Sequence, residues 1–123
     1  MQKLISTAGF IPAAMIALCT SSAFGADVAR GRELYQTCAA CHTERPDALG
    51  PSLKGVVGRK SAALEDFRYS NPMKRANLVW DDDNLRDYIK DPQAKVRGNR
   101  MPYAGLTEGN DVDDVIAYLK TLK

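Results

Sequence analysis

Three side chains that can bond to a metal or a prosthetic group lie together in Cys38-Ala39-Ala40-Cys41-His42. This C-x-x-C-H pattern is typical of covalent haem attachment. Two thiols three positions apart lie on one turn of chain, so each can form a thioether with one of the two vinyl groups of a porphyrin. The imidazole of the next residue is then placed to bind the iron. His42 is the only histidine in the chain, so no other imidazole competes for that position.

Two other functions of closely spaced cysteines are weighed against haem attachment. A thioredoxin-like redox pair would lie where a strand meets a helix, and no segment of the sequence shows the alternation typical of a strand. A structural zinc site needs about four ligands, whereas the chain has no second cluster of cysteine and histidine. The sequence therefore favours haem attachment.

A haem iron with two protein ligands needs a second axial group, and the chain offers two thioethers after the motif, Met73 and Met101. Met101 lies in Gly98-Asn99-Arg100-Met101-Pro102, where the glycine and the proline favour a rigid, extended loop. We predict that Met101 is the ligand; a lysine, a tyrosine or an open position is the alternative. Met73 follows Asn71-Pro72 and is expected to fill the core.

Three segments with helical periodicity are expected to position these residues. The first follows Asp27, a good N-cap residue. The second begins at the acidic run 81–83, which suits the positive end of a helix dipole, and ends at Pro92. The third spans 111–122, with acidic residues first and lysines near its end. Their apolar faces are formed by Val28, Gly31, Leu34, Tyr35 and Cys38, by Leu85, Tyr88 and Ile89, and by Val112, Val115, Ile116, Leu119 and Leu122. Glycine and proline residues mark the rest as loops, which predicts a small all-α domain with long loops.

The first 25 residues have the pattern of a secretory signal peptide. A short basic start is followed by an apolar run over residues 8–19 and by Ala23-Phe24-Gly25. The run is shorter than the ~20 residues of a membrane span. We predict a signal peptide over 1–25, cleavage between Gly25 and Ala26, and a single domain over 26–123; an uncleaved anchor is the alternative.

The composition limits the remaining possibilities. A net charge of +2 argues against a nucleic-acid partner and against an acidic tail. The hydrophobic share of 45% and the charged share of 26% are ordinary for a globular protein. The exported chain would lose Cys19, and its two remaining cysteines are too few for a disulfide scaffold.

Taken in order, several short segments resemble the class I c-type cytochromes, the small soluble group found in mitochondria and bacteria. The resemblance covers residues 31–122. Apart from the haem motif it is carried by Gly31-Arg32-Glu33-Leu34-Tyr35, Gly50-Pro51-Ser52-Leu53, Gly58-Arg59-Lys60, Phe67-Arg68-Tyr69-Ser70, Trp80, Tyr88, Asn99-Arg100-Met101-Pro102-Tyr103-Ala104-Gly105 and Ile116-Ala117-Tyr118-Leu119. It implies the cytochrome c fold, with three main helices and long loops around one covalent haem.

The resemblance also implies roles for single residues. Gly31 and Tyr35 would lie where the first helix crosses the last, because only glycine lets two backbones approach so closely. The carbonyl of Pro51 would accept the imidazole N–H of His42 and orient the ring.

Four further roles concern the haem and its second ligand. Arg59, Tyr69 and Trp80 would partner a buried haem propionate, since a buried carboxylate is costly unless it is paired. The hydroxyl of Tyr88 would reach the sulfur of Met101.

The implied function is that of a periplasmic mono-haem electron carrier and not of an enzyme. One haem c would be bound through Cys38 and Cys41, with His42 and Met101 on the iron. Its partners would be redox proteins met transiently, a donor dehydrogenase or cytochrome complex and an acceptor oxidase or reductase, and the cleaved chain is expected to be a monomer without stable membrane insertion. The alternatives are a dedicated cytochrome subunit of a periplasmic dehydrogenase and, if Met101 is labile, a haem peroxidase or gas sensor.

Overall fold

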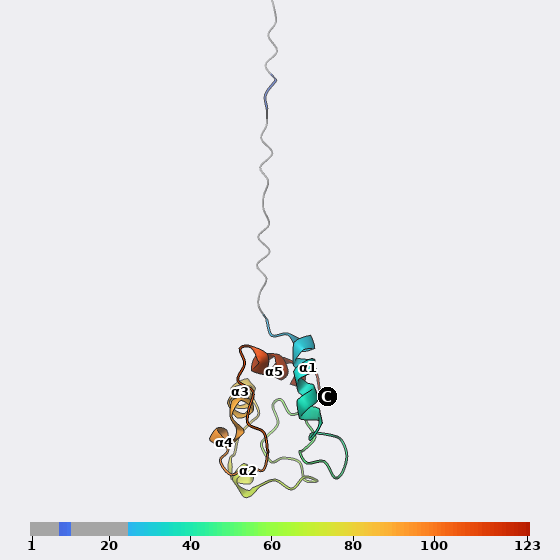
Figure 1. Cartoon of the computed structure of the whole chain (residues 1–123), viewed down its shortest axis with the longest axis vertical. Coiled ribbons are helices and arrows are strands. Elements are labelled where there is room, and N and C mark those ends of the chain that lie inside the picture. The colour runs from blue at the N-terminus through green and yellow to red at the C-terminus, as the bar shows by residue number, and fades with distance from the viewer. Residues whose placement is uncertain (1–7, 11–24) are drawn as a thin grey trace, which may run out of the picture.

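The structure, a computed structural model, describes residues 8–10 and 25–123 and contains, within them, five α-helices and no β-strand (Figure 1). Residues 1–7 and 11–24, which include most of the predicted signal peptide, lie outside the described residues. None of the helices so described combines the length and the apolar character needed to cross a lipid bilayer. The helices are α1 (Val28–Ala39), α2 (Asn71–Arg75), α3 (Asp82–Lys90), α4 (Pro92–Lys95) and α5 (Asp111–Leu119).

Helix α1 begins where the sequence predicts and packs across α5 (Figure 1). The carboxylate of Asp27 caps α1 by accepting a first-turn N–H at 3.1 Å. Gly31 is buried at the crossing, where an added Cβ would overlap the carbonyl of Asp114 and lie 3.0 Å from the Cβ of Tyr118. The rings of Tyr35 and Tyr118 pack beside it with their centroids 5.0 Å apart. The helix crossing implied by the resemblance is therefore present.

Two short helices begin at prolines that the sequence analysis interprets as breakers. Helix α3 starts after Asp81 and ends at Lys90, before Pro92, as predicted, but a second helix that the sequence does not predict follows at once. Asp91 caps a new helix, α4, whose first residue is Pro92. In the same way α2 begins at Asn71-Pro72, a pair predicted to be loop. Proline suits the first turn of a helix because the N–H that it lacks has no helical partner there.

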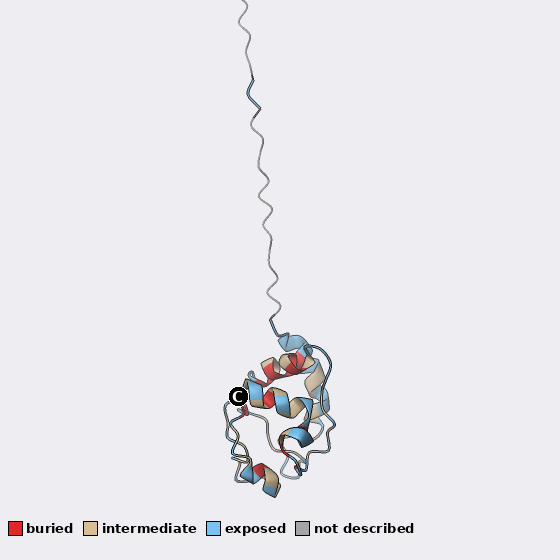
Figure 2. Cartoon of the chain, turned by 90° about the vertical axis from the view of Figure 1, so that its left-hand side faces the viewer, coloured by how far each residue is buried: buried red, intermediate tan, exposed pale blue. Residues whose placement is uncertain are grey.

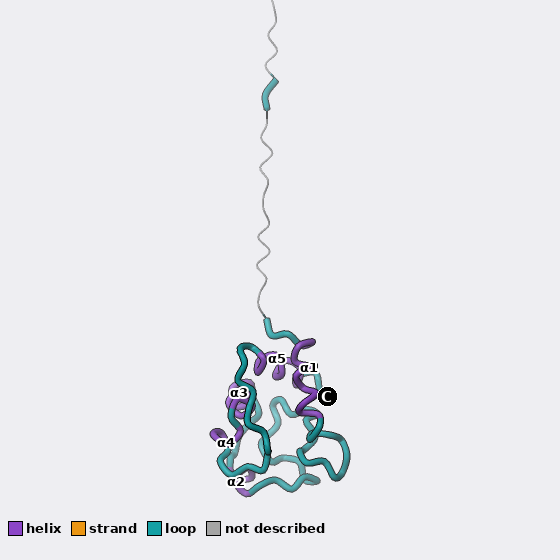
Figure 3. Tube along the Cα trace, in the orientation of Figure 1, coloured by secondary structure: helices purple, strands orange, loops and turns teal. Residues whose placement is uncertain are grey.

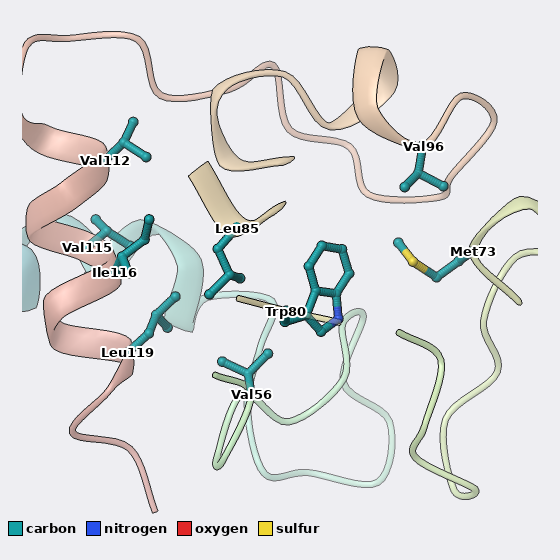
Figure 4. Close-up of a cluster of buried hydrophobic side chains, with 9 residues drawn as sticks. All are labelled: Val56, Met73, Trp80, Leu85, Val96, Val112, Val115, Ile116 and Leu119. Atoms are coloured by element: carbon teal, nitrogen blue, oxygen red, sulfur yellow. The ribbon is translucent and has the colours of Figure 1, made fainter. Parts of the chain in front are cut away.

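The core is built on the apolar face of α5, which packs against α3 and the loops (Figures 2 and 4). In the close-up view, Leu85 of α3 lies next to this helix and the ring of Trp80 lies beyond Leu85. Helix α5 ends at Leu119, so the lysines predicted for its last turn lie just beyond it, while Leu122 still packs on the cluster. The buried cluster consists of Val56, Met73, Trp80, Leu85, Val96, Val112, Val115, Ile116 and Leu119.

Long loops make up much of the domain (Figure 3). One joins α1 to α2 over residues 40–70, and another joins α4 to α5 over residues 96–110. An isolated antiparallel bridge between Lys60 and Val79 ties the first loop to the segment before α3. Loops longer than about 12–15 residues are uncommon in a small domain unless they have a function or something orders them.

Candidate haem-binding site

The C-x-x-C-H motif lies at the carboxyl end of α1. Cys38 is in the last turn of the helix, and the chain turns tightly after it. The backbone N–H groups of Cys41 and His42 both donate to the carbonyl of Cys38, at 3.1 and 3.0 Å. This turn keeps two half-buried thiols and one half-buried imidazole within a single loop of chain.

The surroundings of Cys38 do not favour a redox-active pair, and the described residues do not favour a zinc site. Cys38 and Cys41 are free. Burial raises the pKa of the Cys38 thiol, and the carboxyl end of a helix disfavours a thiolate, whereas a reactive dithiol needs a lowered pKa. Over residues 8–10 and 25–123, no three Cys, His, Asp or Glu side chains are grouped as a metal site requires. Both alternatives from the sequence lose their support.

The imidazole of His42 is held in one tautomer. Its Nδ1 lies 2.7 Å from the carbonyl oxygen of Pro51. A carbonyl can only accept, so Nδ1 donates and Nε2 keeps a free lone pair. Burial lowers the pKa of His42, and the guanidinium of Arg59 lowers it further, against the opposing effect of the hydrogen bond to Pro51. The ring is therefore neutral at neutral pH and oriented as a metal ligand would be.

Gly50, for which the sequence predicts no role of its own at the haem motif, lies against this ring. An added Cβ on Gly50 would be 2.6 Å from Cε1 and 2.7 Å from Nδ1 of His42. The N–H of Gly50 donates to the carbonyl of Cys41 at 3.0 Å, which fixes its backbone beside the motif. A side chain here would displace the imidazole from Pro51. The Gly-Pro pair is visible in the sequence, but its contact with the imidazole is visible only in three dimensions.

Arg59, Tyr69 and Trp80, predicted to serve one propionate, are near one another. The carbonyl of Arg59 accepts the N–H of Trp80 at 2.8 Å, which places the two residues side by side. The guanidinium of Arg59 donates to the carbonyls of Ser52 and Lys54 at 2.9 and 3.1 Å, so two of its five donors serve the loop. Burial raises the pKa of Tyr69, and Arg59 is close enough to act on it in the opposite direction. The structure thus groups a cation and two possible hydrogen-bond donors.

Tyr88 is half-buried and packs next to Trp80. The two ring centroids are 5.0 Å apart, at an interplanar angle of 56°. Burial raises the pKa of Tyr88 to about 12, so its phenol stays protonated and can donate. No hydrogen bond joins this hydroxyl to the sulfur of Met101 among the described residues, and the role toward Met101 stays a prediction.

The two methionines occupy different environments. Met73 is 8% exposed and belongs to the buried cluster, in agreement with a packing role (Figure 4). Met101 is half-buried in the loop that follows α4, and its carbonyl accepts the N–H of Tyr103 at 2.9 Å. Of these two methionines, Met101 is therefore the one whose thioether is not packed in the buried cluster.

Residues 28–123 match the family model for cytochrome c. The chain belongs to the cytochrome c family. It is similar to the cytochrome c2 of Blastochloris viridis, at 37% identity over 109 residues that cover 86% of each chain. The cytochrome c2 of Afifella marina is 44% identical over 100 residues, which cover 76% of this chain and 81% of the relative.

A solved structure supports the same assignment for this cytochrome. Cytochrome cH from Methylobacterium extorquens is 40% identical, with a TM-score of 0.73 over 77% of this chain and 98% of that one. The predicted fold, a small all-α domain with long loops, is therefore confirmed as the cytochrome c fold.

As a class I c-type cytochrome, the protein carries one haem c bound covalently through Cys38 and Cys41, and it transfers electrons. The described residues fit this group. Both thiols are free, the lone pair of Nε2 on His42 is available, and the lack of a side chain on Gly50 leaves room for the imidazole in this orientation.

Proposed function

We propose that this cytochrome is an exported electron carrier in which His42 and Met101 bind the haem iron. The observation that carries the proposal is the 2.7 Å hydrogen bond between Nδ1 of His42 and Pro51. It fixes the tautomer and the orientation of the ring, so Nε2 presents its lone pair in one direction. Met101 supplies the second ligand because Met73 is packed in the core.

The residues of the chain set how the haem behaves. The bound haem supplies an iron that gains or loses one electron. Cys38 and Cys41 hold it covalently, and the soft thioether of Met101 raises the reduction potential. Arg59, Tyr69 and Trp80 pair with a propionate, because a buried carboxylate without partners would destabilise the fold.

The axial ligands also argue that the protein is not an enzyme. With His42 and Met101 both bound, the iron keeps no open position for a substrate or for a small gas. The remaining activity is electron exchange with other redox proteins in short encounters. The signal peptide predicted over residues 1–25 places these partners in the periplasm, where a dehydrogenase or cytochrome complex donates and an oxidase or reductase accepts. The cleaved chain acts as a monomer that is not inserted in the membrane.

A redox titration of the holoprotein tests this function. We expect a single reversible wave that fits one electron, with a slope of about 59 mV per tenfold change in the ratio of oxidised to reduced protein. Carbon monoxide added to the reduced protein should leave its spectrum unchanged, because no position on the iron is free. Tight binding of carbon monoxide would contradict the proposal and favour a peroxidase or a gas sensor.

A further inference from the structure

Asn99, two residues before Met101, is buried with 8% of its surface exposed. Its side-chain amide makes three hydrogen bonds of 2.8 Å. The Nδ2 group donates to the carbonyls of Pro92 and Val96, and Oδ1 accepts the backbone N–H of Met101. Both donor hydrogens of the amide are used. One side chain therefore links helix α4 and the residue after it to the backbone of Met101.

The two carbonyls belong to well-anchored residues. The side chain of Pro92 is fully buried, and that of Val96 is 5% exposed and part of the core cluster (Figure 4). Asn99 thus ties Met101 to two residues that are packed in the interior.

A second amide supports the first. The Nε2 group of Gln93 donates to the carbonyl of Asn99 at 3.0 Å, and its Oε1 accepts the N–H of Gly98 at 3.1 Å. Side-chain amides therefore bind three backbone groups within residues 98–101. Gln93 is exposed, so water can replace its hydrogen bonds more easily than those of Asn99.

Removal of the Asn99 amide would act mainly on Met101. The carbonyls of Pro92 and Val96 also accept backbone N–H groups, from Val96 at 3.0 Å and from Asn99 at 3.1 Å, and they would keep these partners. The N–H of Met101 would lose the hydrogen bond that the amide provides, and leaving a part-buried donor unpaired weakens the anchoring of its backbone.

We propose that Asn99 is a positioning residue that holds the backbone of Met101 and so strengthens the binding of its thioether to the iron. This inference rests on the proposed function, in which Met101 is an axial ligand. If the backbone of Met101 were not anchored, a competing ligand would displace the thioether from the iron more easily. The effect reaches the iron through Met101 and needs no contact between Asn99 and the haem.

Displacement of Met101 by added imidazole tests the proposal. Imidazole is titrated into the ferric holoprotein, and loss of the methionine–iron charge-transfer band gives its affinity. We expect Asn99→Ala to bind imidazole about tenfold more tightly than the wild type, the factor that corresponds to one lost hydrogen bond. Asn99→Asp keeps the shape of the side chain, in case truncation prevents folding. It should also bind more tightly, because it loses both donors and places a carboxylate against two carbonyl oxygens.

Asp114→Ala is the matched control, since Asp114 is a second buried polar residue and its hydrogen-bond partner lies before α1 and not in the loop that carries Met101. Its Oδ1 accepts the N–H of Asp27 at 2.6 Å. This variant should lower the melting temperature and leave the imidazole affinity unchanged. Equal imidazole affinity in the wild type, Asn99→Ala and Asn99→Asp would overturn the role of Asn99 but would leave the proposed function standing. Absence of the charge-transfer band from the wild type would overturn the proposed function and the role of Asn99 with it.

Discussion

Replacing both Cys38 and Cys41 by alanine is expected to abolish the covalent holoprotein and, with it, the fold. No thioether can then form, so acid–acetone should extract any haem that associates with the variant, whereas the haem of the wild type stays with the chain. The variant should show no cooperative thermal transition. The helices within residues 25–123 have 12 residues or fewer, and a helix of this length is marginal without tertiary packing.

The third cysteine provides the control for this experiment. Cys19→Ala removes a thiol from the predicted signal peptide and should leave haem content and melting temperature unchanged. Extraction of the haem from the wild type would contradict covalent attachment. A cooperative transition in the haem-free double variant would show that the loops fold without the haem.

Gly31→Ala is expected to have the second-largest effect, because the added Cβ would overlap the Asp114 carbonyl where α1 crosses α5. Overpacking a core costs about 1–3 kcal/mol, and here the obstacle is backbone, which cannot rotate away. We expect a loss of about 3 kcal/mol, which lowers the melting temperature of the holoprotein by roughly 12–24 °C for a domain of this size.

Gly55→Ala is the matched substitution for this comparison. Gly55 has φ of +68° and open space around an added Cβ, so alanine there adds only backbone strain, about 1 kcal/mol. Its melting temperature should fall by roughly 4–8 °C. Equal losses in the two variants would show that the α1–α5 contact is not as close as the structure has it.

The features that the sequence predicts correctly are local ones. Asp27 caps the helix that follows it because the capping hydrogen bond spans three residues. The haem motif is a five-residue pattern, and the spacing of its three functional side chains is enough to recognise it. The apolar stripe of α5 is likewise readable from its period. Helices α2 and α4 are missed because proline at a helix start and proline as a helix breaker look the same in a sequence.

The residues that escape prediction are those whose partners are distant or depend on a turn. Gly50 lies against an imidazole eight positions away, and only the fold of the loop brings them together. The glycine and proline around Asn99 predict a role for Met101, but they give no sign of the partner of Asn99. Its amide donates to the carbonyl of Pro92, seven positions earlier. Neither residue belongs to a periodic face, so no hydrophobic pattern indicates that it is important.

The ferric absorption spectrum tests the central claim most directly. The account predicts a methionine–iron charge-transfer band in the wild type, its loss in Met101→Leu and its retention in Met73→Leu, since Met73 packs in the core and Met101 does not. The Met73→Leu variant controls for the removal of a thioether as such. A band that survives in Met101→Leu, or that disappears in Met73→Leu, would contradict the assignment of His42 and Met101 as the two ligands of an electron carrier.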